Sequence, residues 1–165
     1  MKPYPLFLDI EASSLTGWPI EIGLSQPGSI GIDTWSSLIR PRPDWSDADW
    51  APEAERVHGI GRARLQSAPP ADLVRKAVEA RIQTVMISDC PAFDGKWLAM
   101  LLGRKVPLID FDLAVIREFG ASALALSRVS LDRIPHPHRA GPDAEAMAQV
   151  WLELSAAFPR VRAWF

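Results

Sequence analysis

Cysteine is nearly absent from this 165-residue sequence, and no stretch of it is a long hydrophobic run. Cys90, the only cysteine, excludes an intramolecular disulfide and fits a reducing compartment. The first residues, MKPYPLFLDI, contain two prolines and an aspartate, so they lack the apolar core of a signal peptide, and no later run is long enough to span a bilayer. We therefore expect a cytoplasmic protein with no membrane partner.

A large excess of charge of either sign is also missing. The sequence has 18 basic and 20 acidic residues, which gives a formal net charge of -2. This balance argues against a protein that coats duplex nucleic acid by charge alone. It does not exclude an enzyme that admits the end of one strand, because divalent ions cancel the charge of the acids that bind them.

Internal repeats, low-complexity segments and a linker between domains are absent as well. Hydrophobic residues make up 48% of the chain and charged residues 23%, which is typical of a globular protein rather than a disordered one. A chain of this length can bury a core without disulfides to stabilise it. We expect residues 1–165 to form a single domain.

The order of the expected elements indicates an α/β fold. Alternating apolar residues predict three successive strands at 6–11, 20–24 and 30–39. Helical spacing, with prolines near helix starts, predicts helices at 67–82, 91–103, 112–119, 121–129 and 142–158, and short strands at 84–88 and 106–109 lie among them. This order favours a layered fold around a mixed five-stranded sheet.

The first strand carries two acids on one of its faces. Alternation along residues 6–11 puts Phe7, Asp9 and Glu11 on the same side. Two carboxylates so close together on an apolar strand are unfavourable unless a positive charge lies between them, and a divalent cation is the natural candidate. The alternative, that the strand ends at Asp9 and both acids face water, stays open at this point.

Two later helices each carry an aspartate at the start of an apolar stripe. Asp94 and Asp143 lie near the N-terminal ends of their helices, on the side of the buried residues. Burying an unpaired carboxylate costs several kcal/mol, and a helix N-terminus returns only about 0.5 to 1 kcal/mol. The difference again indicates a cation, although either aspartate alone could face solvent.

A histidine precedes the second of these helices. His138 lies five residues before Asp143, and His136 is two residues further back. A histidine whose pKa lies near neutral pH can take a proton from a water molecule beside a metal ion. Spacing alone does not separate the two histidines, and either could be a surface residue.

Taken in order, these motifs resemble those of the DnaQ-like 3′-to-5′ exonucleases of the DEDDh group. The first motif is FLDIEASSL, the second PAFDGKWL, and the third HRAGPDA, whose His-x-x-x-x-Asp spacing selects His138. The segment ERVHGIG resembles the family's passage from a helix to a loop, where His58 is structural. Residues 88–91, SDCP, replace a pair that contains asparagine in the family, and Ala12 replaces a common threonine.

The resemblance implies an RNase H-like fold, in which helices flank a mixed five-stranded sheet in three layers. It also implies two-metal hydrolysis of phosphodiester bonds at the 3′ end of single-stranded DNA or RNA, with release of 5′ mononucleotides. Two Mg²⁺ or Mn²⁺ ions would be held by Asp9, Glu11, Asp94 and Asp143, with His138 as the catalytic base.

The resemblance further implies that the loop at residues 12–18 touches the last nucleotide. Its candidate substrate-binding residues are Ala12, Leu15 and Trp18, of which Leu15 or Trp18 would stack on a base. For Trp18 a packing role is equally open. Two alternative functions also stay open: a catalytically inactive binding or structural subunit, and another metal-dependent phosphoesterase. A homodimer through the aromatic tail, Trp164 and Phe165, is possible.

Overall fold

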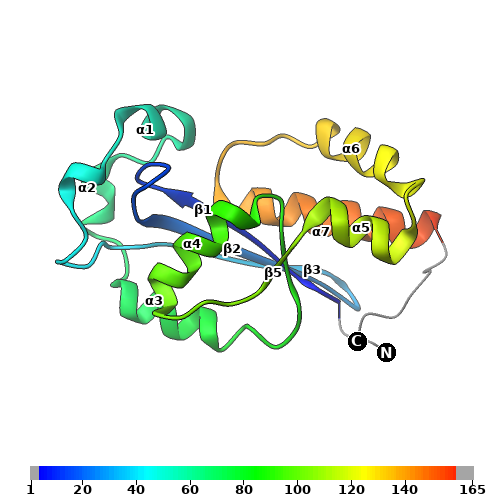
Figure 1. The fold of residues 1–165 in the computed structure, drawn as a ribbon, viewed down its shortest axis with the longest axis horizontal. Coiled ribbons are helices and arrows are strands. Elements are labelled where there is room, and N and C mark those ends of the chain that lie inside the picture. The colour runs from blue at the N-terminus through cyan, green and yellow to red at the C-terminus, as the bar shows by residue number, and fades with distance from the viewer. Residues whose placement is uncertain (1–3, 159–165) are drawn as a thin grey trace.

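A five-stranded mixed sheet forms the centre of the computed structural model, which describes residues 4–158 (Figure 1). Its strands are β1 (Leu6–Ala12), β2 (Pro19–Gly28), β3 (Gly31–Leu38), β4 (Met86–Ser88) and β5 (Leu108–Asp110). Their spatial order is β3-β2-β1-β4-β5; the three strands of the N-terminal meander pair antiparallel, and β4 pairs parallel with both β1 and β5. The mixed five-stranded sheet predicted from the sequence is thus confirmed.

Helices cover both faces of this sheet. They are α1 (Pro52–His58), α2 (Arg62–Leu65), α3 (Ala71–Glu79), α4 (Pro91–Leu102), α5 (Phe111–Phe119), α6 (Ala123–Arg133) and α7 (Ala140–Ala157), with a 3-10 turn, η1, at Asp47–Asp49. Residues of α3 and α4 share one core with the sheet, and residues of α5 and α7 share the other. The result is three layers, as the sequence analysis predicted.

The central strand β1 contributes to both cores because its side chains alternate. Leu6, Leu8 and Ile10 pack in the core of α3 and α4, whereas Phe7 packs in the core of α5 and α7. Asp9 and Glu11 continue the face of Phe7 toward the end of the strand. Since α7 also contacts β1 and β2, the two acids come out of the sheet beside this helix.

Several element boundaries differ from those predicted. Helix α7 begins at Ala140 rather than at 142, because the carboxylate of Glu21 accepts a hydrogen bond from the Ala140 amide and so supports an earlier first turn. Helix α6 runs on to Arg133 rather than ending at 129. The predicted passage from a helix to a loop at ERVHGIG is confirmed, since α1 ends at His58 and Gly59 follows with a left-handed φ of 67°.

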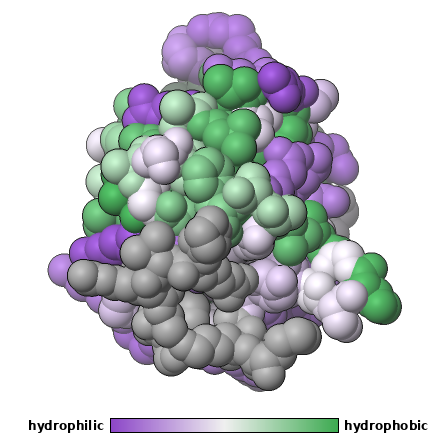
Figure 2. Space-filling view, turned by 90° about the vertical axis from the view of Figure 1, so that its right-hand side faces the viewer, coloured by the Kyte–Doolittle hydropathy of each residue, from purple (hydrophilic) through white to green (hydrophobic). Residues whose placement is uncertain are grey.

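Hydrophobic residues lie on the surface at the side of the molecule where α5 and α6 are found (Figures 1 and 2). Large exposed apolar side chains of these helices are Leu113, Ile116 and Val129. Within residues 4–158, no helix has both the length and the apolarity needed to cross a membrane. Trp164 and Phe165 lie outside the described residues, so the homodimer stays a prediction.

Candidate metal centre

Acidic residues lie close together at the end of β1, in the segment after β4 and at the start of α7. Two groups of possible metal ligands form there, and within each group one ligand atom per residue lies within 4.8 Å of the others. The first group is Glu11, His138 and Asp143; the second is Asp9, Asp89 and Asp94. Both groups line one hollow, so the five residues predicted as metal ligands or base lie close together, and Asp89 lies with them.

Two carboxylate oxygens in this cluster are buried and have no hydrogen-bond partner among residues 4–158. They are Oδ2 of Asp9 and Oδ1 of Asp143. The nearest basic group to the second is Nδ1 of His136, at 3.5 Å, which is too long and too weakly directed to count as a hydrogen bond. Buried carboxylate oxygens without partners are costly, and a bound cation is the usual way in which proteins satisfy them.

Mutual repulsion and burial make these acids hard to ionise together. Burial raises the pKa of Asp9 well above its ordinary value, and Asp94 and Glu11 raise it further. Burial, followed by repulsion from Asp143 and Glu21, raises the pKa of Glu11 to about 7. An all-oxygen donor set in which the negative charges are uncompensated suits a hard divalent cation, so these residues fit Mg²⁺ or Mn²⁺.

Asp94 is fixed in the first turn of α4. It is 2% exposed, and the Ser88 hydroxyl at the end of β4 donates a hydrogen bond to its Oδ2. The same hydroxyl accepts a hydrogen bond from the Cys90 amide at 3.0 Å, which ties the strand to the helix start. Burial raises the pKa of Asp94 to about 7, although the hydrogen bond from Ser88 opposes this effect.

Asp143 is fixed in the first turn of α7. Its Oδ2 accepts a hydrogen bond from the backbone amide of Arg139 at 3.0 Å, which leaves Oδ1 free to face the cluster. His138 lies just before this turn, on the exposed surface. Its φ is 50°, and among the described residues it is the one non-glycine with a positive φ. This conformation folds the chain sharply ahead of α7, so that the imidazole stays near Glu11 and Asp143.

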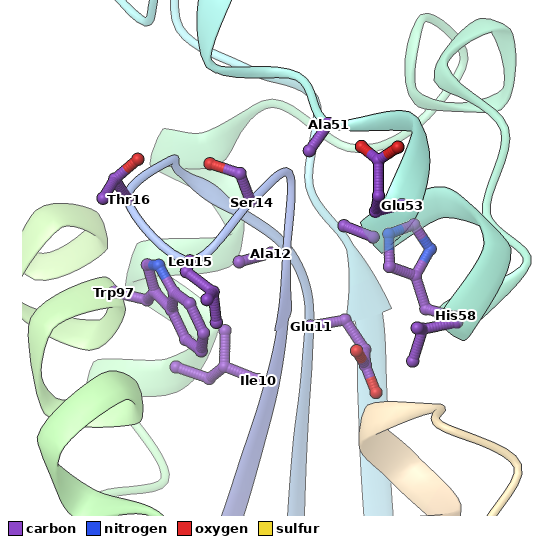
Figure 3. A pocket seen from close by; sticks show the side chains of 12 residues that line it. Ile10, Glu11, Ala12, Ser14, Leu15, Thr16, Ala51, Glu53, His58 and Trp97 are labelled. Atoms are coloured by element: carbon purple, nitrogen blue, oxygen red, sulfur yellow. The ribbon is translucent and has the colours of Figure 1, made fainter.

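The predicted substrate-binding residues have different surroundings. Leu15 is 68% exposed and Ala12 is buried, and both line a cavity of about 510 Å³ next to the acids. Figure 3 shows Leu15 and Trp97 on one side of this cavity, with Glu11 and His58 on the other. A second hollow, of about 460 Å³, contains the acids and shares Glu11, Leu15 and Trp97 with the first.

The structure contradicts a base-stacking role for Trp18 and supports the packing alternative. Trp18 is only 1% exposed, and its indole nitrogen donates a hydrogen bond to the Ser46 carbonyl at 3.0 Å. Its ring stacks on Trp45, with ring centres 5.9 Å apart, and also contacts Trp50. The side chain therefore anchors the loop of residues 40–52 to the start of β2 and presents no face to a ligand.

Sequence reasoning did not select Asp89 as a site residue. The residue directly follows the buried strand β4, at the same edge of the sheet as the end of β1, which is the signal that could have identified it. Glu21 was also missed; it lies opposite Glu11 in the antiparallel pairing of β1 and β2. Which residue of β2 lies opposite Glu11 depends on the register of β1 and β2, and the sequence alone does not give that register.

The sequence matches no protein-family model and no curated protein. Solved structures of exonucleases nevertheless share its fold over nearly its whole length. The chain therefore has the RNase H-like fold that the motifs predicted.

Three of these structures illustrate the likeness. Exonuclease X in complex with 5′ overhanging duplex DNA is 22% identical, with a TM-score of 0.64, and the match covers 92% of this chain and 91% of that one. The nuclease domain of 3′hExo, a DEDDh family member bound to rAMP, is 16% identical, with a TM-score of 0.69 and coverage of 97% and 96%. E. coli exonuclease I in complex with a dA16 oligonucleotide is 14% identical, with a TM-score of 0.67, and the match covers 95% of this chain but 41% of that one.

Proposed function

We propose that this protein is a metal-dependent 3′-to-5′ exonuclease of the DEDDh type, which removes 5′ mononucleotides from single-stranded nucleic acid. One observation carries the proposal: acids from β1, from the start of α4 and from the start of α7 converge with His138, and two of their buried oxygens have no partner in the described part of the chain. The likeness to 3′-exonucleases over the whole fold supports it.

Four of the acids would hold the two ions. These ligands are Asp9, Glu11, Asp94 and Asp143, with Asp89 close to the first and third of them. When bound, Mg²⁺ or Mn²⁺ would supply Lewis-acid chemistry, which acidifies water and stabilises negative charge on the leaving 3′ oxygen. The protein's part is to gather the carboxylates at fixed positions, and the rigid ends of one strand and two helices are suited to that.

His138 would take the proton of the attacking water. Its imidazole lies with Glu11 and Asp143, so it is close to where the scissile phosphate must sit if those acids bind metal. Because the side chain is exposed, the proton could pass on to solvent after each turnover. Asp143 would then both hold an ion and fix the start of the helix that follows the histidine.

The 3′-terminal nucleotide would lie in the cavity beside the acids. Leu15 offers an exposed apolar side chain on which a base can stack, and Ala12 and Trp97 form apolar walls next to it. An apolar cavity with few polar groups suits a base of any identity. We therefore expect little sequence preference.

The test is an assay on short single-stranded DNA and RNA with a labelled 3′ end. With Mg²⁺ or Mn²⁺ the label should be released as a mononucleotide, and EDTA should stop the release. Replacing Asp143→Asn should lower the rate about 100-fold or more, since a lost ligand removes several kcal/mol of stabilisation. Asp72→Asn, which changes an exposed acid on α3, is the matched control and should retain full activity.

Other outcomes of the same assay separate the alternatives. Release of phosphate from a simple phosphomonoester, with the oligonucleotides intact, would identify a different phosphoesterase. Tight binding of oligonucleotides with no turnover in either metal would identify a binding or structural protein, and the exonuclease proposal would then be wrong.

A further inference from the structure

A partly buried ion pair lies next to the candidate metal centre. Glu21 on β2 is only 3% exposed, and its carboxylate accepts hydrogen bonds from Nε and Nη2 of Arg139, at 2.8 and 2.6 Å. A third hydrogen bond, at 3.1 Å, comes from the Ala140 amide at the start of α7. The fork of the guanidinium matches the two carboxylate oxygens, which is the strongest arrangement that such a pair can adopt.

Arg139 connects this pair to the candidate site through its own backbone. Its side chain reaches Glu21, while its amide donates a hydrogen bond to Oδ2 of Asp143. It also directly follows His138, whose positive φ sets the turn. One residue therefore links the sheet to both members of the third motif.

Close packing holds the same turn against the sheet. Gly23 lies two residues after Glu21, on the same face of β2. A Cβ atom added to Gly23 would lie 1.9 Å from the Ala140 carbonyl oxygen, so the backbone of α7 rests directly on the strand. A Cβ atom added to Gly141 would lie 3.0 Å from the side chain of Ser36 on β3, which is a less severe but still tight approach. The start of α7 is thus held against β2 and β3 by close packing, and the ion pair lies beside this contact.

The pair also controls charge next to the metal ligands. Glu21 faces Glu11 across the two strands, so its negative charge lies beside a candidate ligand, and the guanidinium of Arg139 compensates that charge. Without Arg139, Glu21 would be an uncompensated buried carboxylate beside the cluster. With it, both oxygens of Glu21 are engaged and only the site acids remain available to an ion.

We propose that Glu21 and Arg139 are positioning residues, which hold His138 and Asp143 over Glu11 before a divalent ion binds. This inference rests on the proposed function, since the ion is the one that the exonuclease would use. It predicts that breaking the pair weakens ion binding and turnover together, because Asp143 and His138 lose their fixed positions. The oligonucleotide cavity has other walls, so KM should change little.

The test compares Glu21→Ala, Glu21→Gln and Arg139→Lys with the unaltered protein. Mn²⁺ affinity is measured by calorimetry on metal-free protein, kcat and KM on the oligonucleotides, and thermal stability by circular dichroism. Glu21→Ala should weaken Mn²⁺ binding and lower kcat by about 10- to 100-fold, as is usual for residues that orient metal ligands. Glu21→Gln should keep part of the Mn²⁺ affinity and part of kcat, because its carbonyl oxygen can still accept hydrogen bonds from Ala140 and Arg139. Arg139→Lys should show weaker Mn²⁺ binding and a lower kcat than Glu21→Gln, because an ammonium group cannot form the two parallel hydrogen bonds.

Glu79→Ala is the matched control, since it breaks a more exposed ion pair with Arg75 on α3. It should leave Mn²⁺ affinity and kcat unchanged. A Glu21→Ala protein that is less stable but binds Mn²⁺ and cleaves as the unaltered protein does would overturn the positioning role and leave the proposed function intact. If Glu21→Ala does not fold, Glu21→Gln and Arg139→Lys carry the same comparison. An unaltered protein that neither binds Mn²⁺ nor cleaves would overturn the proposed function itself.

Discussion

Two histidines lie beside Asp143, and their contacts differ. Nε2 of His136 is 2.9 Å from the Leu131 carbonyl oxygen, which can only accept, so this nitrogen carries a proton. His136 is therefore tied to the end of α6. His138 lies with Glu11 and Asp143 on the exposed side of the cluster. At the scale of single residues, this difference favours His138 as the group that exchanges protons with solvent.

The first prediction concerns this pair of histidines. His138→Ala should fold normally but lower kcat by about 100- to 10,000-fold, which is the usual contribution of a general base. His136→Ala should lower kcat much less, because the hydrogen bond of its ring goes to the Leu131 carbonyl at the end of α6. Single-turnover rates on a labelled oligonucleotide measure both. A larger loss in His136→Ala than in His138→Ala would reverse the assignment.

At the scale of elements, the start of α7 decides how the site is assembled. This helix lies on β2 and β3 with no room for a side chain at Gly23, and it carries Asp143 in its first turn. Helix α4 brings Asp94 from the opposite layer, with Pro91 in its first turn, where a missing amide donor is harmless. The site therefore depends on two helix starts that the sheet holds in place.

A second prediction follows for Gly23→Ala. The new methyl group would overlap the backbone of Ala140, which cannot move without lifting α7 from the sheet. The free energy of unfolding should fall by roughly 1–3 kcal/mol or more, as for other overpacked positions. Gly28→Ala, also on β2 but with its nearest atom at 3.5 Å, is the control and should be nearly neutral. Urea unfolding followed by circular dichroism gives both values; equal stability of the two variants would contradict the close contact.

At the scale of the whole molecule, the clustered acids should make stability depend on pH and on metal. The pKa of Glu11 rises from 4.5 to about 7 on folding, and that of Asp94 from 3.8 to about 7. Between these values the folded protein holds more protons than the unfolded chain. The contribution of these two carboxyl groups to the free energy of unfolding must therefore fall as the pH rises through this range. A divalent ion that binds only the folded protein should restore the lost stability.

The third prediction tests this linkage with Glu11→Gln, which keeps the shape of the side chain and removes its titration. In EDTA, this variant should lose less thermal stability than the unaltered protein between about pH 5 and about pH 7.5. Added Mn²⁺ should stabilise the unaltered protein more than the variant. Glu79→Gln is the control for removal of an acid elsewhere. Parallel pH profiles for the unaltered protein and Glu11→Gln would show that Glu11 is not a cause of the pH dependence.

The sequence by itself determined the elements, the alternation of β1 and the order of the three motifs, because these depend on neighbours along the chain. It therefore predicted the mixed sheet, and it placed acids at the end of β1 and in the first turns of α4 and α7. Only the tertiary structure decided that Trp18 is buried, that Asp89 joins the cluster and that Glu21 binds Arg139, 118 residues away. Each of these is a contact across space, and its energy depends on burial and on which surfaces meet, neither of which is written in local spacing.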